Sequence, residues 1–385
     1  MAELAVAEDL LLRLAPELVD AVLLRLPPGE PACLVRASVV CKPWFRILAD
    51  PGFRRRYLEF HRTPSVLGLF EDDGAYVRTS ALPSVYPGRG RLVDRPLDCR
   101  HGRALLAPYS RSFREGEAVI LTVLDPLTGR LRRVLSPVDE HVLWFSAAVL
   151  CAAQGCDHYG CQGGHFRLAV VTTDDAGVTS GWLYSSETHV WSELTTVGHP
   201  KVAYCANQGA PSVLVGETLY FNIDGIIELH LGKLCLSKFE KPIAGKGRLM
   251  TAQGGGLGFI AMVNVTNLTM WSGEAGAGPK GAMEWTKLRI IDLRKLLPAG
   301  ALMTQTVDYG INGVAKGTQV IFVSTCLGSY MVDLKSRQVR MVSGRGRNIT
   351  PYMSFYIPAI KAASTSKGQR AGASSVRRAG ARGRR

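Results

Sequence analysis

Apolar residues near the start of the chain recur with the period of an α-helix. The repeat consists of Leu14, Leu18, Val22 and Leu26, with Val19 and Leu23 beside them. A spacing of four residues places side chains on one helical face, so the pattern predicts an amphipathic helix. Pro16 and Glu17 suit its first turn, where a backbone amide has no partner and a negative charge is favoured. Pro27, Pro28 and Gly29 then end the helix.

Two further short helices are predicted before residue 60. One covers Pro31 to Ser38, with Pro31 in its first turn. The other begins after Pro43, contains Trp44, Phe45, Ile47 and Leu48, and ends at Asp50-Pro51-Gly52. Three short helices in about forty residues make a small core, and domains of that size usually depend on a partner.

Four segments of this region carry a resemblance to a known family. They are Leu14-Ala-Pro-Glu-Leu18, Leu24-Arg-Leu-Pro27, Val39-Val-Cys-Lys-Pro-Trp44 and Asp50-Pro-Gly-Phe53. In this order, over residues 12–57, they resemble the F-box, whose usual pattern begins Leu-Pro-x-Glu-Leu and closes with Val-Cys-Lys-x-Trp. Ala15 stands where the family has proline, and Pro16 follows it, which shifts the first turn slightly. The resemblance implies docking onto the Skp adaptor of a cullin-RING ubiquitin ligase.

From about Thr63 onward, short apolar runs alternate with Gly, Pro, Asp and Ser, which is typical of strands and turns. Val119 to Asp125 and Leu131 to Leu135 are predicted to form a hairpin around Pro126-Leu-Thr-Gly129. Similar units begin at positions 123, 183, 228, 290 and 331. Such an irregular period, of roughly 40–60 residues, is typical of propeller blades, whose closed ring leaves few exposed strand edges.

The same region resembles the F-box-associated propeller of plant F-box proteins, especially those of a large grass family. The segments Asp125-Pro-Leu-Thr-Gly129 and Cys156-Asp-His-Tyr-Gly-Cys-Gln-Gly-Gly164 carry this likeness. The predicted fold is therefore α+β and multidomain. A three-helix F-box domain (1–60) precedes an all-β propeller-like domain (61–358) of six or seven blades, and a tail (359–385) follows.

The positive charge of the chain is concentrated in its tail. The 385 residues carry 46 Lys and Arg against 32 Asp and Glu, a formal net charge of +14. Eight of these positive charges, and no acid, lie at Lys361, Lys367, Arg370, Arg377, Arg378, Arg382, Arg384 and Arg385. The remaining chain gives a weak case for nucleic acid. The tail is predicted to be disordered, as a solvated extension, a nuclear import signal or a non-specific nucleic-acid contact.

Targeting features favour a cytoplasmic or nuclear protein. The longest apolar run, Leu143 to Ala153, is far shorter than the roughly 20 residues that a membrane helix needs. Glu3, Glu8 and Asp9 replace the basic start of a secretory signal. We therefore expect the nine cysteines to be reduced thiols.

The candidate adaptor contacts are the apolar positions of the F-box-like segment. They are Leu14, Pro16, Leu18, Val22, Leu26, Pro27, Cys41 and Trp44. These residues could simply fill a three-helix core, but about forty residues cannot hide so many large side chains, and the surplus suits a protein partner. The resemblance favours Pro16, Leu18 and Trp44 as adaptor contacts.

A second cluster of chemically active residues contains cysteines and histidines. Cys151, Cys156, His158, Cys161 and His165 lie within fifteen residues, and zinc favours such ligands. Structural zinc sites usually place ligand pairs in two knuckles, whereas only one cluster is present here. Gly155, Gly160, Gly163 and Gly164 favour a loop between blades instead. We therefore expect no metal and no cofactor.

No catalytic pattern emerges from the sequence. The doublets Asp72-Asp73 and Asp174-Asp175 are typical of capped turns, and Gly254 to Gly258 is typical of a tight turn before a strand at Phe259. Most of the tryptophans, with Tyr184 and Tyr220, are expected to pack between sheets. The predicted function is a non-catalytic substrate receptor that binds a target protein through its propeller. The alternative is a propeller that binds, or hydrolyses, a carbohydrate or other small ligand.

Overall fold

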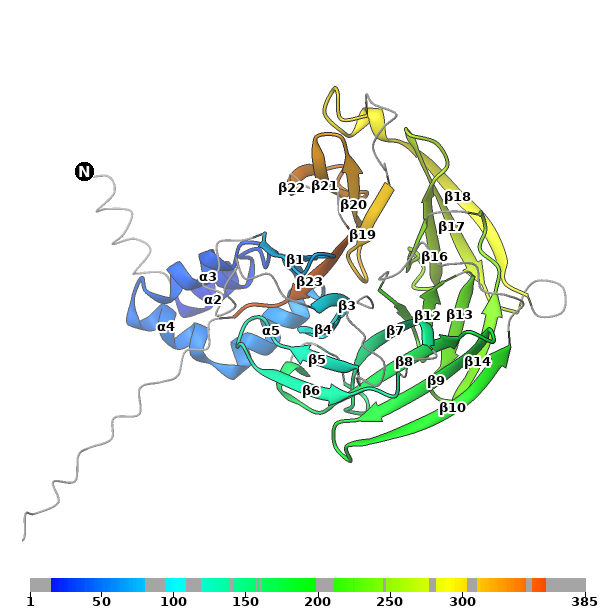
Figure 1. Ribbon diagram of the computed structural model, residues 1–385. Helices are drawn as coiled ribbons and strands as arrows, with labels where there is room; N and C mark the ends of the chain where they lie inside the picture. Colours follow the sequence, from blue (N-terminus) through cyan, green and yellow to red (C-terminus); the bar gives the residue numbers. More distant parts are fainter. Residues whose placement is uncertain are drawn as a thin grey trace, which may run out of the picture.

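The fold was analysed in a computed structural model (Figure 1). It describes residues 15–79, 94–108, 119–138, 142–156, 158, 161–198, 211–223, 225–244, 247–276, 282–302, 310–343 and 348–357. Leu14 and the basic tail, both the subject of sequence predictions, lie outside the described residues.

The described chain begins with four helices. They are α2 (Pro16–Leu24), α3 (Pro31–Ser38), α4 (Lys42–Ala49) and α5 (Pro51–His61). The sequence predicted the first three, and Pro16 and Glu17 occupy the first turn of α2 as expected. The expectation of three helices was wrong, because Asp50-Pro51-Gly52 both ends α4 and starts α5. The Asp50 carboxylate accepts a hydrogen bond from the Phe53 amide at 3.0 Å, and the proline ring fits the first helical position.

The strands form six antiparallel sheets arranged in a ring (Figure 1). The first blade contains β3 (Asp94–Arg100), β4 (Arg103–Pro108), β5 (Ile120–Leu124) and β6 (Leu131–Leu135). The second contains β7 (Val142–Cys151), β8 (Phe166–Asp174), β9 (Val178–Ser185) and β10 (Val190–Gly198). The third contains β11 (Val213–Val215), β12 (Thr218–Asn222), β13 (Ile226–His230) and β14 (Cys235–Phe239).

Two further blades continue the ring. The fourth contains β15 (Gly247–Thr251), β16 (Leu257–Met262), β17 (Asn267–Glu274) and β18 (Glu284–Asp292). The fifth contains β19 (Gly310–Val314), β20 (Val320–Thr325), β21 (Gly328–Asp333) and β22 (Val339–Ser343). Two short 3₁₀ helices, η2 (Cys161–Gly163) and η4 (Leu293–Lys295), lie in connections. The protein is therefore a β-propeller of six blades, the smaller of the two predicted numbers.

The sixth blade joins the two ends of the propeller. It combines β1 (Ser65–Glu71) and β2 (Tyr76–Arg78) with the last strand, β23 (Ile349–Ser354), in the order β2-β1-β23. β1 and β23 pair in antiparallel register from Ser65↔Ser354 to Glu71↔Ile349. β23 also contacts the inner strands β19 and β3 of the neighbouring blades. The ring is thus closed by pairing residues that lie far apart in the sequence.

Four blades share one turn between their third and fourth strands. The first residue of this turn is Asp125, Ser185, His230 or Asp333, and its side chain accepts a hydrogen bond from the amide two residues later, at 2.8–3.3 Å. The fifth residue is Gly129, His189, Leu234 or Arg337, with φ between 53° and 72°. These turns explain the sequence repeats that begin at 123, 183, 228 and 331. The repeat at 290 is different, because it falls on β18 and η4.

The core is divided among the interfaces between blades. Each of the six interfaces contains its own cluster of buried apolar residues. Leu121 and Phe145 lie in the cluster between the first and second blades, for example, and Phe70 and Cys99 in the one between the sixth and first. The alternation of side chains along each strand supplies both interfaces of its blade, so the sheets stack face to face around the ring.

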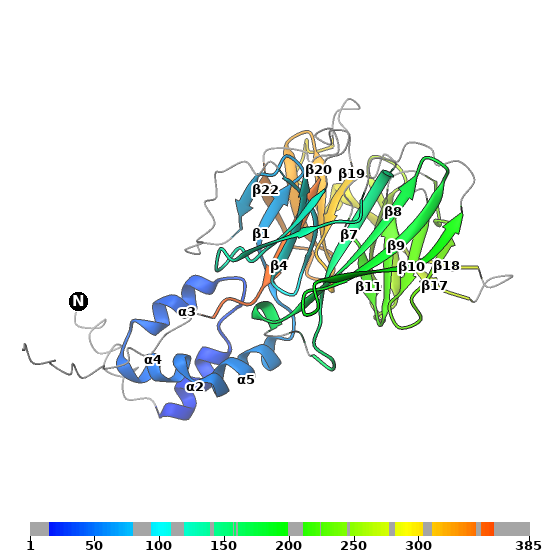
Figure 2. The same cartoon turned by 60° about the horizontal axis from the view of Figure 1, so that its bottom comes forward.

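The helices pack as a unit against the end of the propeller chain (Figure 2). Their core contains Leu23, Phe53 and Tyr57, all with 0% exposure, and also Phe355, which follows β23. The Tyr57 hydroxyl donates to the Leu26 carbonyl at 2.8 Å, which ties α5 to the end of α2. None of the described helices is both long and apolar enough to cross a bilayer.

Candidate functional site

The first candidate site is the outer surface of the helices. Leu18 and Val22 lie one turn apart on α2 and are 56% and 50% exposed. Val39 and Val40, just after α3, are also exposed. The helical core instead takes Val19 and Leu23 from α2. The surface of α2 therefore presents apolar side chains that no described part of the chain covers, and such exposure is typical of protein-binding surfaces.

The structure divides the predicted adaptor contacts into two groups. Exposed positions are Pro16, Leu18, Val22 and Pro27. Half-buried positions are Leu26, Cys41 and Trp44, of which Leu26 and Trp44 pack against the helical core. Leu14 lies outside the described residues. The apolar stripe predicted for the first helix is thus not its buried face, since Val19 and Leu23 occupy that face.

The second candidate site is a cavity of ≈ 390 Å³ where the inner strands of the blades converge. Residues from β3, β11, β15, β19 and β23 line it, and so do Arg62 and Pro64 after α5. Its basic lining residues are Arg62, Arg100, Arg248 and Lys316, and His101 and His158 also line it; burial lowers the pKa of His101 to about 3, so that imidazole is neutral. Among the described residues that line the cavity, none is an aspartate or a glutamate. The cavity wall is therefore strongly cationic.

One buried carboxylate lies behind this wall. Asp98, on β3, has 0% exposure, and it accepts hydrogen bonds from Lys316 Nζ and, at 3.0 Å, from the Val149 amide. The Nε atom of Arg100 lies 3.8 Å from Asp98 Oδ2. Burial lowers the pKa of Lys316 to about 7. Asp98 thus lies beside both Lys316 and Arg100, and it cannot neutralise both side chains when Lys316 is protonated.

Arg100 is buried and Arg248 is half-buried; both donate to neutral acceptors, and each has one acid nearby, Asp98 for Arg100 and Asp72 for Arg248. Arg100 Nη2 donates to the Ser212 carbonyl at 2.9 Å, while its Nη1 has no hydrogen-bond partner among the described residues. Arg248 donates to the Ile311 carbonyl and to Asn348 Oδ1, at 3.0 and 2.5 Å. Burial lowers the pKa of both arginines to about 10, so both stay charged at neutral pH. Buried charges of this kind favour an anionic ligand.

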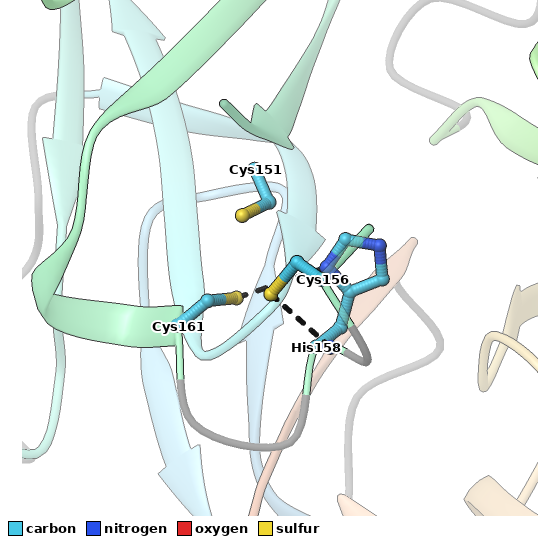
Figure 3. A group of neighbouring side chains, drawn as sticks. All are labelled: Cys151, Cys156, His158 and Cys161. Carbon is cyan, nitrogen blue, oxygen red and sulfur yellow. Dashed lines mark hydrogen bonds between the residues drawn. The ribbon is translucent and has the colours of Figure 1, made fainter. Parts of the chain in front are cut away.

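A third group of residues lies in the connection between β7 and β8 (Figure 3). Ligand atoms of Cys151, Cys156, His158 and Cys161 all lie within 4.8 Å of one another. The connection was predicted to join two blades, which was wrong, because β7 and β8 belong to the same blade. His165, also considered in the sequence, is not part of this convergent group.

The other sequence features have structural roles. Asp73 and Asp174 accept hydrogen bonds from the Ala75 and Val178 amides, at 3.1 and 2.7 Å, which confirms the predicted capped turns. The glycines at 254–256 form a turn before β16, also as predicted. Trp144, Tyr184 and Tyr220 are buried in the clusters between blades, and Trp182, Trp191, Trp271 and Trp285 pack against those clusters.

Comparisons with known proteins do not identify a family. No family model matches the sequence, and no curated protein matches it. Solved structures that match include TolB from Acinetobacter baumannii, at 10% identity over 83% of this chain and 73% of TolB, with a TM-score of 0.36. The periplasmic gluconolactonase PpgL of Pseudomonas aeruginosa matches at 14% identity over 72% of this chain and 82% of PpgL, with a TM-score of 0.39. Likenesses this distant carry no argument about function.

The class of the protein therefore follows from its own sheets and helices. It is a six-bladed β-propeller preceded by a small helical unit.

Proposed function

We propose that the protein is a substrate receptor of a cullin-RING ubiquitin ligase, with its helices bound to a Skp-type adaptor and its propeller bound to a target protein. The observation that carries this proposal is the exposure of Leu18 and Val22 on α2, inside the segment that resembles an F-box. The receptor itself breaks no bond. It holds target lysines near the ubiquitin-charged enzyme and so raises their local concentration.

The exposure of this face supports a docking role over a purely structural one. A helix that served only its own core would direct its apolar residues inward. In α2, Val19 and Leu23 already fill the core, so Leu18 and Val22 are not needed there. Burying large aliphatic side chains against a partner stabilises a complex through the loss of exposed apolar surface.

The test is a quantitative binding assay between the full chain and a Skp-type adaptor. The variant Leu18→Asp/Val22→Asp places two charges on the proposed docking face, and Leu131→Asp changes a comparably exposed residue on the propeller. If each docking residue contributes more than about 1 kcal/mol, the double variant weakens binding roughly 30-fold or more. Leu131→Asp is expected to bind like the wild type. Absence of adaptor binding by the wild-type chain overturns the proposal.

A second candidate function comes from the cationic cavity. Its wall carries Arg100, Arg248 and Lys316, and Arg100 has an unpaired Nη1 atom among the described residues. This arrangement supports binding of a small anionic ligand, with no pair of carboxylates lining the described cavity for glycoside hydrolysis. Thermal stabilisation by inorganic phosphate at constant ionic strength tests the idea. Lys316→Met is expected to reduce the stabilisation, and an equal effect of chloride rules the ligand site out.

A further inference from the structure

We propose that Cys151, Cys156, His158 and Cys161 form a structural zinc site in the hairpin between β7 and β8. Their ligand atoms lie within 4.8 Å of one another, in the part of the chain that the structure describes (Figure 3). With Zn–S bonds of about 2.3 Å and Zn–N bonds of about 2.0 Å, neighbouring ligand atoms of a tetrahedral site lie roughly 3.5–3.8 Å apart. A contraction of about 1 Å therefore converts the observed cluster into a coordination shell.

The described residues around the cluster come from the end of a strand and from the loop that follows it. Cys151 is the last residue of β7, and Cys161 begins η2. Gly155 and His158 adopt left-handed φ values of 61° and 63°. The His158 amide donates to Cys156 Sγ at 3.4 Å, and His158 Nδ1 lies 3.9 Å from Cys161 Sγ. One knuckle thus supplies three ligands, and the strand supplies the fourth.

Arg103 supports the loop from the neighbouring blade. Its Nη2 atom donates to the carbonyls of Cys161 and Gly164, at 2.6 and 2.8 Å. These bonds orient η2 without involving any of the thiols. Outer residues that fix the orientation of metal ligands are a general property of metal sites. The ligands are therefore positioned by contacts that exist independently of a metal.

The charge of Arg103 is the second observation that points to a metal complex. The side chain is buried, with 3% exposure, and its Nη1 atom has no hydrogen-bond partner among the described residues. No carboxylate in the described chain forms an ion pair with it. A buried guanidinium is costly without a counter-charge. Zinc with three thiolates and one neutral imidazole carries a net charge of −1, which is the counter-charge that Arg103 lacks.

The choice of metal follows from the ligand set. Three sulfur atoms and one imidazole nitrogen suit zinc, whereas calcium and magnesium require oxygen ligands. All four positions of a tetrahedron are filled by protein, so no position is open for water or substrate, and the site is structural. Zinc replaces the proton of each thiol on binding, and those protons go to the solvent.

The experiment measures bound metal in the full-length chain, purified with reductant and without chelator. Elemental analysis is expected to give one zinc per chain, and cobalt substitution is expected to give the absorption of tetrahedral thiolate coordination. Cys156→Ser and Cys161→Ser remove ligands, and Cys235→Ser changes a half-buried cysteine of β14 outside the cluster. The ligand variants are expected to lose more than the roughly 10–100-fold in zinc affinity that loss of a supporting residue costs. Cys235→Ser is expected to bind like the wild type.

Three results overturn the proposal. The first is a folded wild-type chain that takes up no stoichiometric zinc from a micromolar zinc solution. The second is unchanged zinc affinity in both ligand variants, which places the metal elsewhere. The third is a metal content dominated by iron with sulfide, which indicates a cluster of another kind. Because unfolding also abolishes binding, the far-ultraviolet circular dichroism of each variant is compared with that of Cys235→Ser.

Discussion

Replacing Asp98 by asparagine tests the electrostatic centre of the propeller. Asp98 has 0% exposure, and its carboxylate joins Lys316, from the fifth blade, to the Val149 amide of the second blade. Asparagine keeps the shape of the side chain but removes its charge, so Lys316 and Arg100 lose their shared counter-charge. Breaking a buried ion pair from one side costs about 3–5 kcal/mol, a large part of the roughly 5–15 kcal/mol that stabilises a folded protein.

Thermal unfolding followed by circular dichroism measures this loss. At about 2–4 °C per kcal/mol, the midpoint of Asp98→Asn is expected to fall by roughly 6–20 °C. Asp175→Asn, at an exposed turn, removes the same charge and is expected to leave the midpoint nearly unchanged. The double variant Asp98→Asn/Lys316→Met is expected to recover part of the loss, because one of the two orphaned cations is gone.

A clear outcome would refute this reasoning. If the free energy of unfolding of Asp98→Asn lies within about 1 kcal/mol of the wild-type value, the buried cations are compensated without Asp98. The double variant would then show no recovery. The cavity would then carry no excess positive charge, and the proposed anion site would lose its support.

Three further predictions concern turns, caps and the cavity. Gly129→Ala is expected to cost about 1 kcal/mol in urea unfolding because φ is 72°, whereas Arg337→Gly, at the equivalent and exposed turn position, is expected not to destabilise; the opposite order would contradict the shared turn. Asp50→Ala is expected to cost about 1 kcal/mol by removing the cap of α5, and an unchanged melting curve would contradict that role. Lys316→Met is expected to weaken phosphate binding in calorimetry, and tighter binding would exclude this lysine as an anion contact.

Local patterns predicted most of the elements but not how they face one another. The spacing of Leu18 and Val22 correctly predicted a helix. Val19 and Leu23 follow the same spacing, so periodicity could not decide which pair is buried. Packing of α2 against α4 and α5 decides it, and no local signal in the sequence specifies that packing.

Features that depend on the pairing of distant residues could not be predicted from the sequence. The number of blades depends on the pairing of β1 with β23, residues that lie near opposite ends of the propeller chain. The ion pair between Asp98 and Lys316 spans 218 positions. Sequence patterns report on residues that are close together in the chain. The cavity of a closed ring is instead lined by inner strands that are far apart in the chain.

The convergence of the cysteine and histidine side chains was not predicted from the sequence, for a different reason. The spacing rule for zinc sites assumes two knuckles, and the single run from Cys156 to Cys161 did not satisfy it. A hairpin provides another route, because its first strand ends at Cys151, beside the returning loop. Recognising a strand end next to a short cysteine and histidine run could have suggested the convergence.

The position of Phe355 has a consequence for biosynthesis. A ribosome delivers the helices first, but the side chain that completes their interior emerges only after the last strand. Until then the nascent chain carries both an unfinished helical interior and an open ring. A messenger truncated shortly before codon 355 would therefore yield a protein with an incomplete helical core and an unclosed propeller. Cellular quality control could recognise either defect.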